Sequence, residues 1–317
     1  LYRKDDTGNV TTDEINLASS VNRLGHELYG CKGSLTAWIA ATELLEKRKM
    51  PWHIFALGQA FAAPLWAFTG LSGMTLSLHG KSGGGKTLIQ MWQQSVWGDP
   101  NKLHYAAEFT LNALYSRMGL YNNLPMTIDE TSLMDDAIVG KFCHMVTQGA
   151  EKARLDRTAT ERIAKTWAMP VTISTNNAFV GKLASTNANV EAQMFRILEI
   201  EVPKHELFAK DSAGGRTLYN FIASNYGFVG DVYAKALLRI GEEKLRQRVE
   251  QTTKDFAGLY DFTFSGPERF WETCAVLNHL GYEIATEAGL VKLDYTLGVK
   301  YVLHQIPSQR RTVDETR

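Results

Sequence analysis

The sequence predicts an α/β protein in which a parallel β-sheet carries a phosphate-binding loop and helical segments precede and follow the sheet. Four short apolar runs rich in Ile, Val and Thr alternate with helical stretches between residues 74 and 203. One of these runs leads directly into a glycine-rich loop, LHGKSGGGKTLIQ, at residues 78–90. The segments on both sides of this region carry apolar residues at helical spacing, and no strand pattern follows Pro203. This alternation favours a parallel sheet that helices cover on both faces.

The segment at residues 14–70 is predicted to be helical. Its two clearest stretches, SLTAWIAATELLEKRK and WHIFALGQAFAAPLWAF, have apolar residues at helical spacing. Residues 54–78 contain no charged side chain and are long enough on paper to cross a bilayer. Pro64 and three glycines interrupt this run, and it continues straight into the glycine loop. We therefore expect a buried helix followed by a buried strand, and no membrane span.

Four buried strands are expected in the central region, and helices are predicted between them over Thr87–Val96 and Met134–Gln148. In chain order, the strands are MTLSLH, LPMTID, MPVTIST and RILEIEVP. The residues after Pro203 are predicted to form helices up to the C-terminal region.

Composition limits the classes of function. The 317 residues have a formal net charge of zero, so the chain is not a general nucleic-acid binder, and any polyanion site needs a local basic patch or assembly. The cysteines Cys31, Cys143 and Cys274 match no zinc or redox spacing and are expected to be buried thiols in a reducing compartment, the cytoplasm. The chain starts with Leu and its opening resembles no signal peptide, so we expect a piece of a longer protein.

The glycine loop matches the motif G-x-x-x-x-G-K-[ST] between a strand and a helix, which is the context of a P-loop. The glycines let the backbone wrap so that its N–H groups point at phosphate oxygens, and the following helix adds its positive N-terminal end. Lys86 is predicted to reach the β- and γ-phosphates of ATP, and Thr87 to hold Mg²⁺. The predicted nucleotide contacts are Gly80, Lys81, Ser82, Gly83, Gly84, Gly85, Lys86, Thr87 and Leu88.

An acidic pair ends the second predicted strand, LPMTIDE. Asp129 is predicted to complete the Mg²⁺ site with Thr87, and Glu130 to polarise the attacking water as general base. Acidic residues at strand ends are often merely exposed to solvent. The P-loop upstream is the reason for assigning this pair to a metal and water site.

Four further polar residues are candidates for sensing or stabilising the nucleotide. Asn176 ends the third strand, where a polar side chain can contact the γ-phosphate, and Asn177 is the second choice. Arg196 opens the fourth strand and is predicted to face the nucleotide of a neighbouring subunit; alternatively it pairs with an acidic residue of its own strand. Arg269 in the C-terminal helices is a candidate nucleotide-sensing arginine.

The order of several motifs resembles one family. The segments PLWAFTGLSGMTLSLHGKSGGGKTLIQMWQQSVWGDP, LPMTIDE, QGAEKARLDR, WAMPVTISTNN and AQMFRILEIEVP are similar to those of helicase-like ATPases of phages, plasmids and mobile elements, a family long catalogued as a bacterial domain of unknown function. That family looks like a relative of AAA+ and superfamily-three replicative helicases. The resemblance covers residues 30 to 295. The chain departs from the family pattern at Gly83, Gly84 and Leu88, and at Asn176–Asn177, where the family often has Gly-Glu.

The resemblance implies a DNA-stimulated ATPase and helicase, assembled as a hexameric ring, that replicates a phage or mobile element. It also implies that a primase or polymerase-like domain precedes the motor in a longer chain. The expected division is a helical N-terminal cap at residues 1–70, a P-loop ATPase core at 71–203 and a helical C-terminal lid at 204–317.

A basic stretch precedes the third strand, at the place where related motors project a hairpin or loop into the ring pore. Cationic groups there would track the backbone of single-stranded DNA. Asp156 and Glu161 offer the alternative of a solvated segment with internal ion pairs. The predicted DNA contacts are Lys152, Arg154, Arg157, Arg162 and Lys165.

Two other functions remain open on the sequence alone. The chain could be a P-loop ATPase of another class, such as a defence-system NTPase or a protein remodeller, whose hydrolysis DNA does not stimulate. It could also be a nucleotide-binding switch without turnover, although Glu130 argues against that because a binder needs no water-activating carboxylate.

Overall fold

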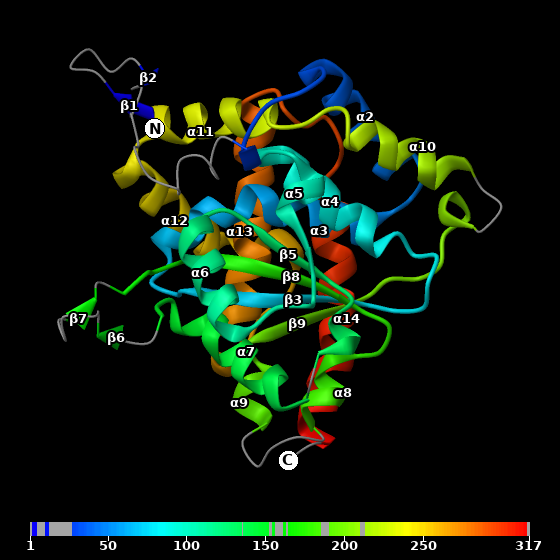
Figure 1. Ribbon diagram of the computed structural model, residues 1–317, viewed down its shortest axis with the longest axis vertical. Helices are drawn as coiled ribbons and strands as arrows, with labels where there is room; N and C mark the ends of the chain where they lie inside the picture. Colours follow the sequence, from blue (N-terminus) through cyan, green and yellow to red (C-terminus); the bar gives the residue numbers. More distant parts are fainter. Residues whose placement is uncertain are drawn as a thin grey trace.

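The fold is organised around one parallel β-sheet (Figure 1). The computed structural model describes residues 2–4, 10–12, 27–134, 136–151, 154–155, 161–162, 164–184, 190–209 and 213–315. The sheet has five strands in the order β4-β5-β8-β3-β9, and every pairing in it is parallel. The strands are β3 (Gly73–His79), β4 (His104–Ala106), β5 (Met126–Asp129), β8 (Met169–Thr175) and β9 (Ile197–Glu201). The predicted α/β class with a parallel sheet is confirmed.

Four of these strands are the ones that the sequence predicts, and β4 is the one that it misses. Strand β4 has only three residues, of which none is fully buried, so it lacks the apolar run that identifies the others. It pairs with β5 alone and forms one edge of the sheet. Two small antiparallel pairs complete the strands, β1 (Tyr2–Lys4) with β2 (Val10–Thr12) and β6 (Arg154–Leu155) with β7 (Glu161–Arg162).

Helices precede, cross over and follow the sheet. The predicted helices over Thr87–Val96 and Met134–Gln148 are confirmed as α4 and α7, and after β9 the described residues form no further strand. The helical elements are α2 (Leu35–Lys47), α3 (Pro51–Ala62), η1 (Ala63–Phe68), α4 (Lys86–Trp97), α5 (Pro100–Leu103), α6 (Leu111–Tyr121), η2 (Thr131–Leu133), α7 (Asp136–Gln148), α8 (Phe179–Ala184), α9 (Val190–Met194), η3 (Glu206–Phe208), α10 (Ala213–Ile222), α11 (Phe228–Ile240), α12 (Glu242–Tyr260), η4 (Gly266–Glu268), α13 (Arg269–Glu287) and α14 (Thr296–Glu315).

Helix α3 lies in the interior. Pro51 opens it at a position where the missing N–H costs nothing, and every residue from Trp52 to Ala62 is buried. It packs against α4, α13 and α14 and against the sheet, which accounts for its lack of charged residues. Within the part of the chain that the structure describes, no helix is long and apolar enough to cross a membrane.

Side chains from three other helices donate hydrogen bonds to carbonyl groups of α3. A carbonyl oxygen can accept a second hydrogen bond besides the one it accepts within the helix, so these side chains hold α3 in one orientation without breaking its own hydrogen bonds. The bonds run from Tyr282 Oη to Ile54 O (2.5 Å), Asn278 Nδ2 to Phe55 O (2.7 Å), Gln93 Nε2 to Ala56 O (2.6 Å), Trp97 Nε1 to Ala60 O (3.0 Å) and Tyr233 Oη to Phe61 O (2.9 Å).

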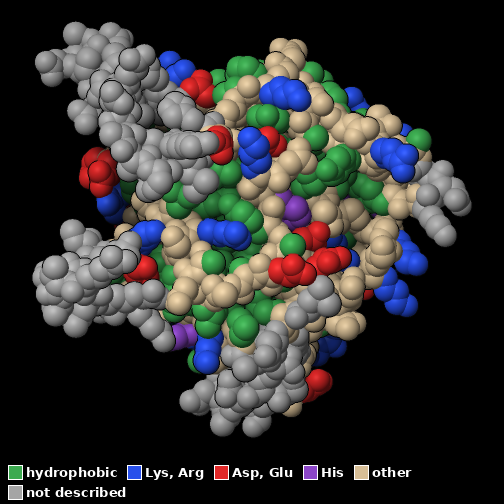
Figure 2. Space-filling model, in the orientation of Figure 1, with side chains coloured by type: hydrophobic (Ala, Val, Ile, Leu, Met, Phe, Trp, Pro, Cys, Tyr) green, Lys and Arg blue, Asp and Glu red, His purple; other side chains and the backbone are tan. Residues whose placement is uncertain are grey.

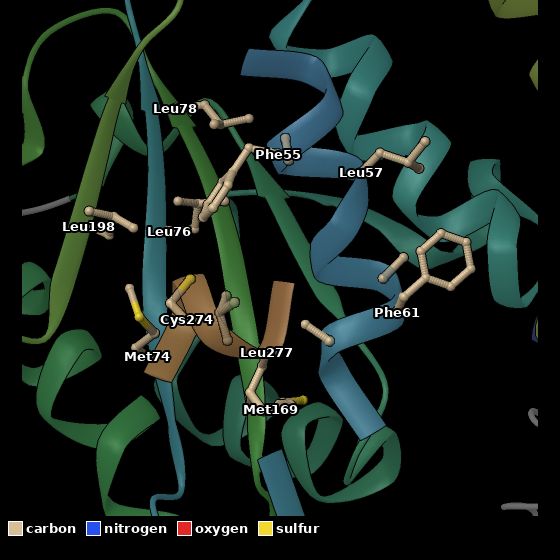
Figure 3. Close-up of a cluster of buried hydrophobic side chains, with 14 of the residues drawn as sticks. Phe55, Leu57, Phe61, Met74, Leu76, Leu78, Met169, Leu198, Cys274 and Leu277 are labelled. Atoms are coloured by element: carbon tan, nitrogen blue, oxygen red, sulfur yellow. The ribbon is translucent and has the colours of Figure 1, made fainter. Parts of the chain in front are cut away.

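Strand β3 separates two packing environments, because successive side chains of a strand point to opposite faces. Figure 3 shows Met74, Leu76 and Leu78 of β3 clustered with Phe55 of α3 and Leu277 of α13. The intervening Ser77 is also buried, and its hydroxyl donates to Glu199 Oε1 on β9 at 3.2 Å. Glu199 Oε1 also accepts the backbone N–H of Phe179, at the first residue of α8.

Helix α14 covers the outer edge of β9 with glutamine side chains. Gln309 accepts the N–H of Glu199 through Oε1 at 3.1 Å and donates from Nε2 to the carbonyl of Ile197 at 2.7 Å. Gln305, one helical turn earlier, accepts the N–H of Glu201 at 2.8 Å. These side chains take the place of a neighbouring strand on this edge.

The cysteines follow the sequence expectation in part. Cys143 and Cys274 are buried, whereas Cys31 is exposed, so the expectation of three buried thiols is wrong at that position. Cys31 precedes α2 and lies next to Lys32, whose backbone pairs with that of Tyr226. That pairing holds the segment by backbone contacts and leaves the thiol outside the core.

We predict that Gly58→Ala destabilises the fold. Gly58 lies in α3 where α13 crosses, and a Cβ there would stand 2.5 Å from Asn278 Nδ2 and overlap the Tyr282 ring. Both of these side chains are fixed by hydrogen bonds to α3, so they cannot move aside cheaply. We expect the free energy of unfolding, measured by urea denaturation, to fall by about 1–3 kcal/mol despite the better helix propensity of Ala.

The matched control is Gly258→Ala. Gly258 lies on the exposed side of α12, and a Cβ there would meet no atom within 4 Å, so stability should stay unchanged or rise. Equal stability of Gly58→Ala and the parent protein would contradict the close packing of α3 on α13.

Candidate functional site

A pocket of about 500 Å³ opens at the edge of the sheet where the strands have their carboxyl ends. It is bounded by the loop after β3, by the residues that follow β5 and β8, and by α10. Parallel strands end at the same edge, which is why segments far apart in sequence meet there. Of the predicted site residues, Ser82 to Leu88, Asp129, Glu130 and Asn176 line this pocket.

The glycine loop has a backbone that other residues would strain. Gly80, Gly83 and Gly85 have φ angles of 136°, 95° and 78°, in the region that favours glycine. Gly85 immediately precedes α4, so the N-terminal end of that helix faces the pocket. This arrangement of backbone and helix is suited to binding an anion.

Two aromatic side chains support the loop at Gly85, one of them fully buried and the other partly buried. His53 of α3 is completely buried, and its Nε2 lies 3.3 Å from the carbonyl oxygen of Gly85. Burial lowers the pKa of His53 to about 3, so the ring is neutral and can donate from Nε2. Its ring centroid is 5.5 Å from that of Phe208 in η3, and a Cβ at Gly85 would overlap the Phe208 ring. No sequence motif marks His53 or Phe208, because only the tertiary fold brings them to the loop.

Lys86 folds back over the loop that it follows. Its Nζ donates a hydrogen bond to the carbonyl of Gly80 and lies 3.5 Å from the carbonyl of Lys81. Partial burial lowers the pKa of Lys86, and the charge of Asp129 opposes this shift. Gly80 and Lys81 thus contact Lys86 from the start of the loop.

Asp129 is the most highly connected acidic group of the pocket. Its Oδ2 accepts the hydroxyl of Thr87 at 2.8 Å, and its Oδ1 accepts the hydroxyl of Ser174 on β8. His104 of β4 brings Nε2 to 3.5 Å from Oδ2. Burial by itself would raise the pKa of Asp129, but the contacts with His104, Ser174 and Thr87 outweigh it and lower the pKa to about 2. Asp129 is therefore ionised at neutral pH, next to a hydroxyl group.

Glu130 has an unusual backbone. Its φ and ψ angles are 56° and 39°, a left-handed conformation that costs a non-glycine residue about 1–2 kcal/mol. The backbone N–H of Glu130 donates to Ser174 Oγ at 3.1 Å, and the Thr131 hydroxyl donates to the Ser174 carbonyl at 2.8 Å. These bonds to β8 hold the turn that leaves Glu130 exposed at the pocket.

Helix α10 supplies pocket residues that the sequence analysis missed. Arg216 and Tyr219 both line the pocket, one helical turn apart. The only local signal is the pair Gly214–Gly215 before Arg216, which allows close approach of the backbone, and Gly215 is itself part of the lining.

The two other predicted arginines lie at the opposite, amino end of the sheet. Arg269 is exposed at the start of α13. Two residues later, Nε1 of Trp271 donates a hydrogen bond to the carbonyl of Ile197, the first residue of β9, so the start of α13 lies at the amino end of that strand. Arg196 immediately precedes β9, and its Nη1 lies 3.3 Å from Nδ1 of His144 on α7. The structure does not bring either arginine to the pocket of its own chain.

The predicted DNA-binding stretch forms an antiparallel pairing before β8. Arg154 of β6 pairs with Arg162 of β7, and a further bridge joins Ala150 to Thr166. Figure 1 shows this pair standing off one side of the molecule. Nζ of Lys165 donates to Ser116 Oγ at 3.0 Å. Lys152 and Arg157 lie outside the described residues, as does the side-chain placement of Arg154 and Arg162.

A solved structure shares this fold. A structure described as "SCCmec type IV Cch - active helicase" matches with a TM-score of 0.67 at 17% sequence identity, covering 99% of this chain and 60% of that one. This chain thus spans less than two thirds of that protein. Two further structures match too weakly for structural argument. NtrX from Brucella abortus has a TM-score of 0.30 at 12% identity, covering 77% of this chain and 57% of that one. An inhibitor-bound JCV helicase has a TM-score of 0.29 at 10% identity, covering 78% of this chain and 73% of that one.

The chain was also compared with curated proteins and with protein families. No curated protein matches it. Residues 7–186, more than half of the chain, match DUF927, a domain of unknown function, and this match includes the glycine loop, Asp129, Glu130 and Asn176. The chain therefore belongs to the DUF927 family.

Proposed function

We propose that this chain is a Mg²⁺-dependent ATPase and the motor of a DNA helicase. The observation that carries the proposal is the convergence of the glycine loop, the Thr87–Asp129 pair, Glu130 and Asn176 on one pocket. A loop that binds phosphate, oxygen ligands for a metal and a carboxylate for water are the parts that phosphoryl transfer to water requires. The proposal includes the P-loop, the helical cap and the lid expected from the sequence.

Different residues of the pocket bind the phosphates, activate the water and sense the nucleotide. The backbone of residues 80–86 and the N-terminal end of α4 hold the phosphates, and Lys86 neutralises their charge. Glu130 accepts a proton from the attacking water, and Asn176 orients the water or the γ-phosphate. Arg216 of α10 brings positive charge from the far side of the pocket, and we assign to it the nucleotide-sensing role expected of Arg269.

Mg²⁺ fits the donors present. Thr87 Oγ1 and the ionised Asp129 Oδ2 are 2.8 Å apart, and Mg²⁺ prefers one or two such oxygen ligands together with phosphates and waters. Within the described residues there is no cluster of three or more His, Cys, Asp or Glu side chains that would suit a transition metal. When bound, the ion would neutralise charge on the phosphates while Asp129 and Thr87 hold it.

The motor part of the proposal rests on the fold and on the position of the basic residues. The fold resembles that of a protein described as an active helicase. Figure 2 shows basic and acidic side chains interspersed among the described residues of the visible face, and these residues form no broad basic surface there. A ring of copies, six by the sequence resemblance, would gather the cations of residues 152–165 around single-stranded DNA in its pore. A primase or polymerase-like domain in the same longer chain, and a cytoplasmic location, belong to this proposal.

The first prediction from the proposed function separates nucleotide binding from hydrolysis. Glu130→Gln should bind ATP like the parent protein but hydrolyse it about 10²- to 10⁴-fold more slowly, because an amide cannot take the proton of water. Lys86→Ala should lose turnover and ATP affinity together, since it removes charge from the phosphates. Phosphate release and equilibrium ATP binding measure the two effects, with Glu206→Gln, an exposed carboxylate of η3, as control. Parental turnover of Glu130→Gln would rule out its role as base.

The second prediction is that Arg196 acts on the nucleotide of a neighbouring copy. Arg196→Ala keeps its own pocket intact, and Lys86→Ala keeps its own Arg196. Mixed assemblies of the two inactive variants should therefore regain ATPase activity where an intact Arg196 meets an intact loop. Titrating one variant into the other and measuring phosphate release tests this. Full DNA-stimulated activity from a protein that sediments as a monomer would disprove both the trans role and the ring.

The third prediction concerns DNA. Single-stranded DNA should stimulate ATP hydrolysis, and replacing Arg157, Arg162 and Lys165 by Gln should weaken binding of the strand. Each lost phosphate contact should flatten the slope of log affinity against log salt by about 0.7. Lys254→Gln, on the exposed side of α12, is the control and should leave the slope unchanged. An unchanged slope in the triple variant would place the DNA contact elsewhere, and an ATPase indifferent to DNA would favour a different class of P-loop enzyme.

A further inference from the structure

The pocket has an apolar part that its phosphate chemistry does not use. Lys86, Thr87, Asp129, Glu130 and Asn176 give one part the groups that triphosphate and metal need. Leu88, Phe208, Ala209, Gly215 and Tyr219 line the same pocket, and apart from the Tyr219 hydroxyl their side chains carry no polar group. A nucleotide whose phosphates occupy the glycine loop has a base that must lie against some other part of the wall.

Among the described residues that line the pocket, the aromatic side chains are Phe208 and Tyr219. Phe208 is already engaged, because it packs against His53 with ring centroids 5.5 Å apart and fills the space over Gly85. Tyr219 is 40% exposed, so part of its ring is open to solvent in the pocket. Tyr219 therefore has a ring surface available to a ligand.

The Tyr219 ring is held in place at both ends. Its backbone belongs to α10, which packs against α4, the helix that follows the glycine loop. Its hydroxyl donates to Asn101 Oδ1 at 3.0 Å, and Asn101 is fixed in turn by a backbone hydrogen bond to Asp99 Oδ1 at 3.0 Å. A ring whose orientation is fixed before binding loses little conformational entropy when a ligand stacks on it.

Arg216 and Tyr219 share a face of α10. They lie three residues apart, a spacing that places side chains next to each other on a helix, and both line the pocket. One helix face thus presents a cation, suited to phosphate, beside an aromatic ring, suited to a base.

We propose that Tyr219 is the platform on which the nucleotide base stacks, and that it gives the pocket a preference for purine over pyrimidine nucleoside triphosphates. This proposal rests on the proposed function, since it needs the triphosphate in the glycine loop. A purine covers more of the ring than a pyrimidine does, so it gains more from stacking. The Tyr219 hydroxyl hydrogen is committed to Asn101, so this residue does not donate a bond that would distinguish adenine from guanine.

Equilibrium binding to the full chain tests the proposal, with tripolyphosphate as a probe that has phosphates but no base. Tyr219→Ala should weaken binding of ATP and GTP by about 5- to 150-fold, the range for loss of one base–aromatic stack. It should leave tripolyphosphate affinity unchanged and reduce the ratio of ATP to CTP affinity. Tyr219→Phe keeps the ring and should retain ATP affinity within about threefold, which is less than the loss of a stack.

Phe228→Ala is the matched control, because Phe228 is an aromatic residue with a similar exposure of 38% at the start of α11. It should change none of these affinities. Parental ATP affinity in Tyr219→Ala would overturn the proposal. An equal loss for ATP and tripolyphosphate would also overturn it, because the residue would then act by placing α10 and not by holding the base.

The same measurements distinguish this proposal from the proposed function. A parent chain that binds tripolyphosphate and ATP equally well would keep the phosphate site and reject the base platform. A parent chain that binds neither would reject both.

Discussion

The burial of α3 is the constraint on which the rest of the structure depends. Its carbonyls accept side-chain hydrogen bonds from α4, which follows the glycine loop, and from α11 and α13 of the C-terminal region. These three helices are therefore fixed to the same central helix. The same helix carries His53, which contacts Gly85. The geometry of the glycine loop therefore depends on the core packing as much as on the glycines themselves.

The structure separates two groups of polar residues by the length of the sheet. The pocket lies at the carboxyl ends of the strands, whereas Arg196, Arg269 and the β6–β7 pair lie near the amino ends of β8 and β9. Among the described residues of one chain, those proposed for hydrolysis do not meet Lys165, proposed for DNA, or Arg196, proposed for a neighbour. A function that couples them requires the sheet to transmit a change from one end to the other, or a second copy to bring the ends together.

Elements and site residues that depend on local sequence patterns could be predicted, whereas those that depend on tertiary packing could not. Buried strands are recognised by continuous apolar runs. The GKT motif and the Asp-Glu pair each come at or after the end of such a run, which places them at the carboxyl edge of a parallel sheet. Strand β4 has no such run, because it is a short edge strand. His53, Phe208 and Tyr219 are ordinary aromatic residues of helical segments, and nothing nearby in sequence marks them. Arg216 could not be identified from the sequence, because helical periodicity does not say which C-terminal helix turns toward the pocket.

The glutamines that cover β9 also limit how copies of this chain can join. With the N–H groups of Glu199 and Glu201 bonded to Gln309 and Gln305, this edge has no free donors there for an incoming strand. A neighbour cannot dock on β9 by extending the sheet from one molecule into the next, which is a rigid form of attachment. Contacts between copies on this side of the sheet would instead run through side chains on helices and loops, which can slide and re-form as a bound nucleotide changes.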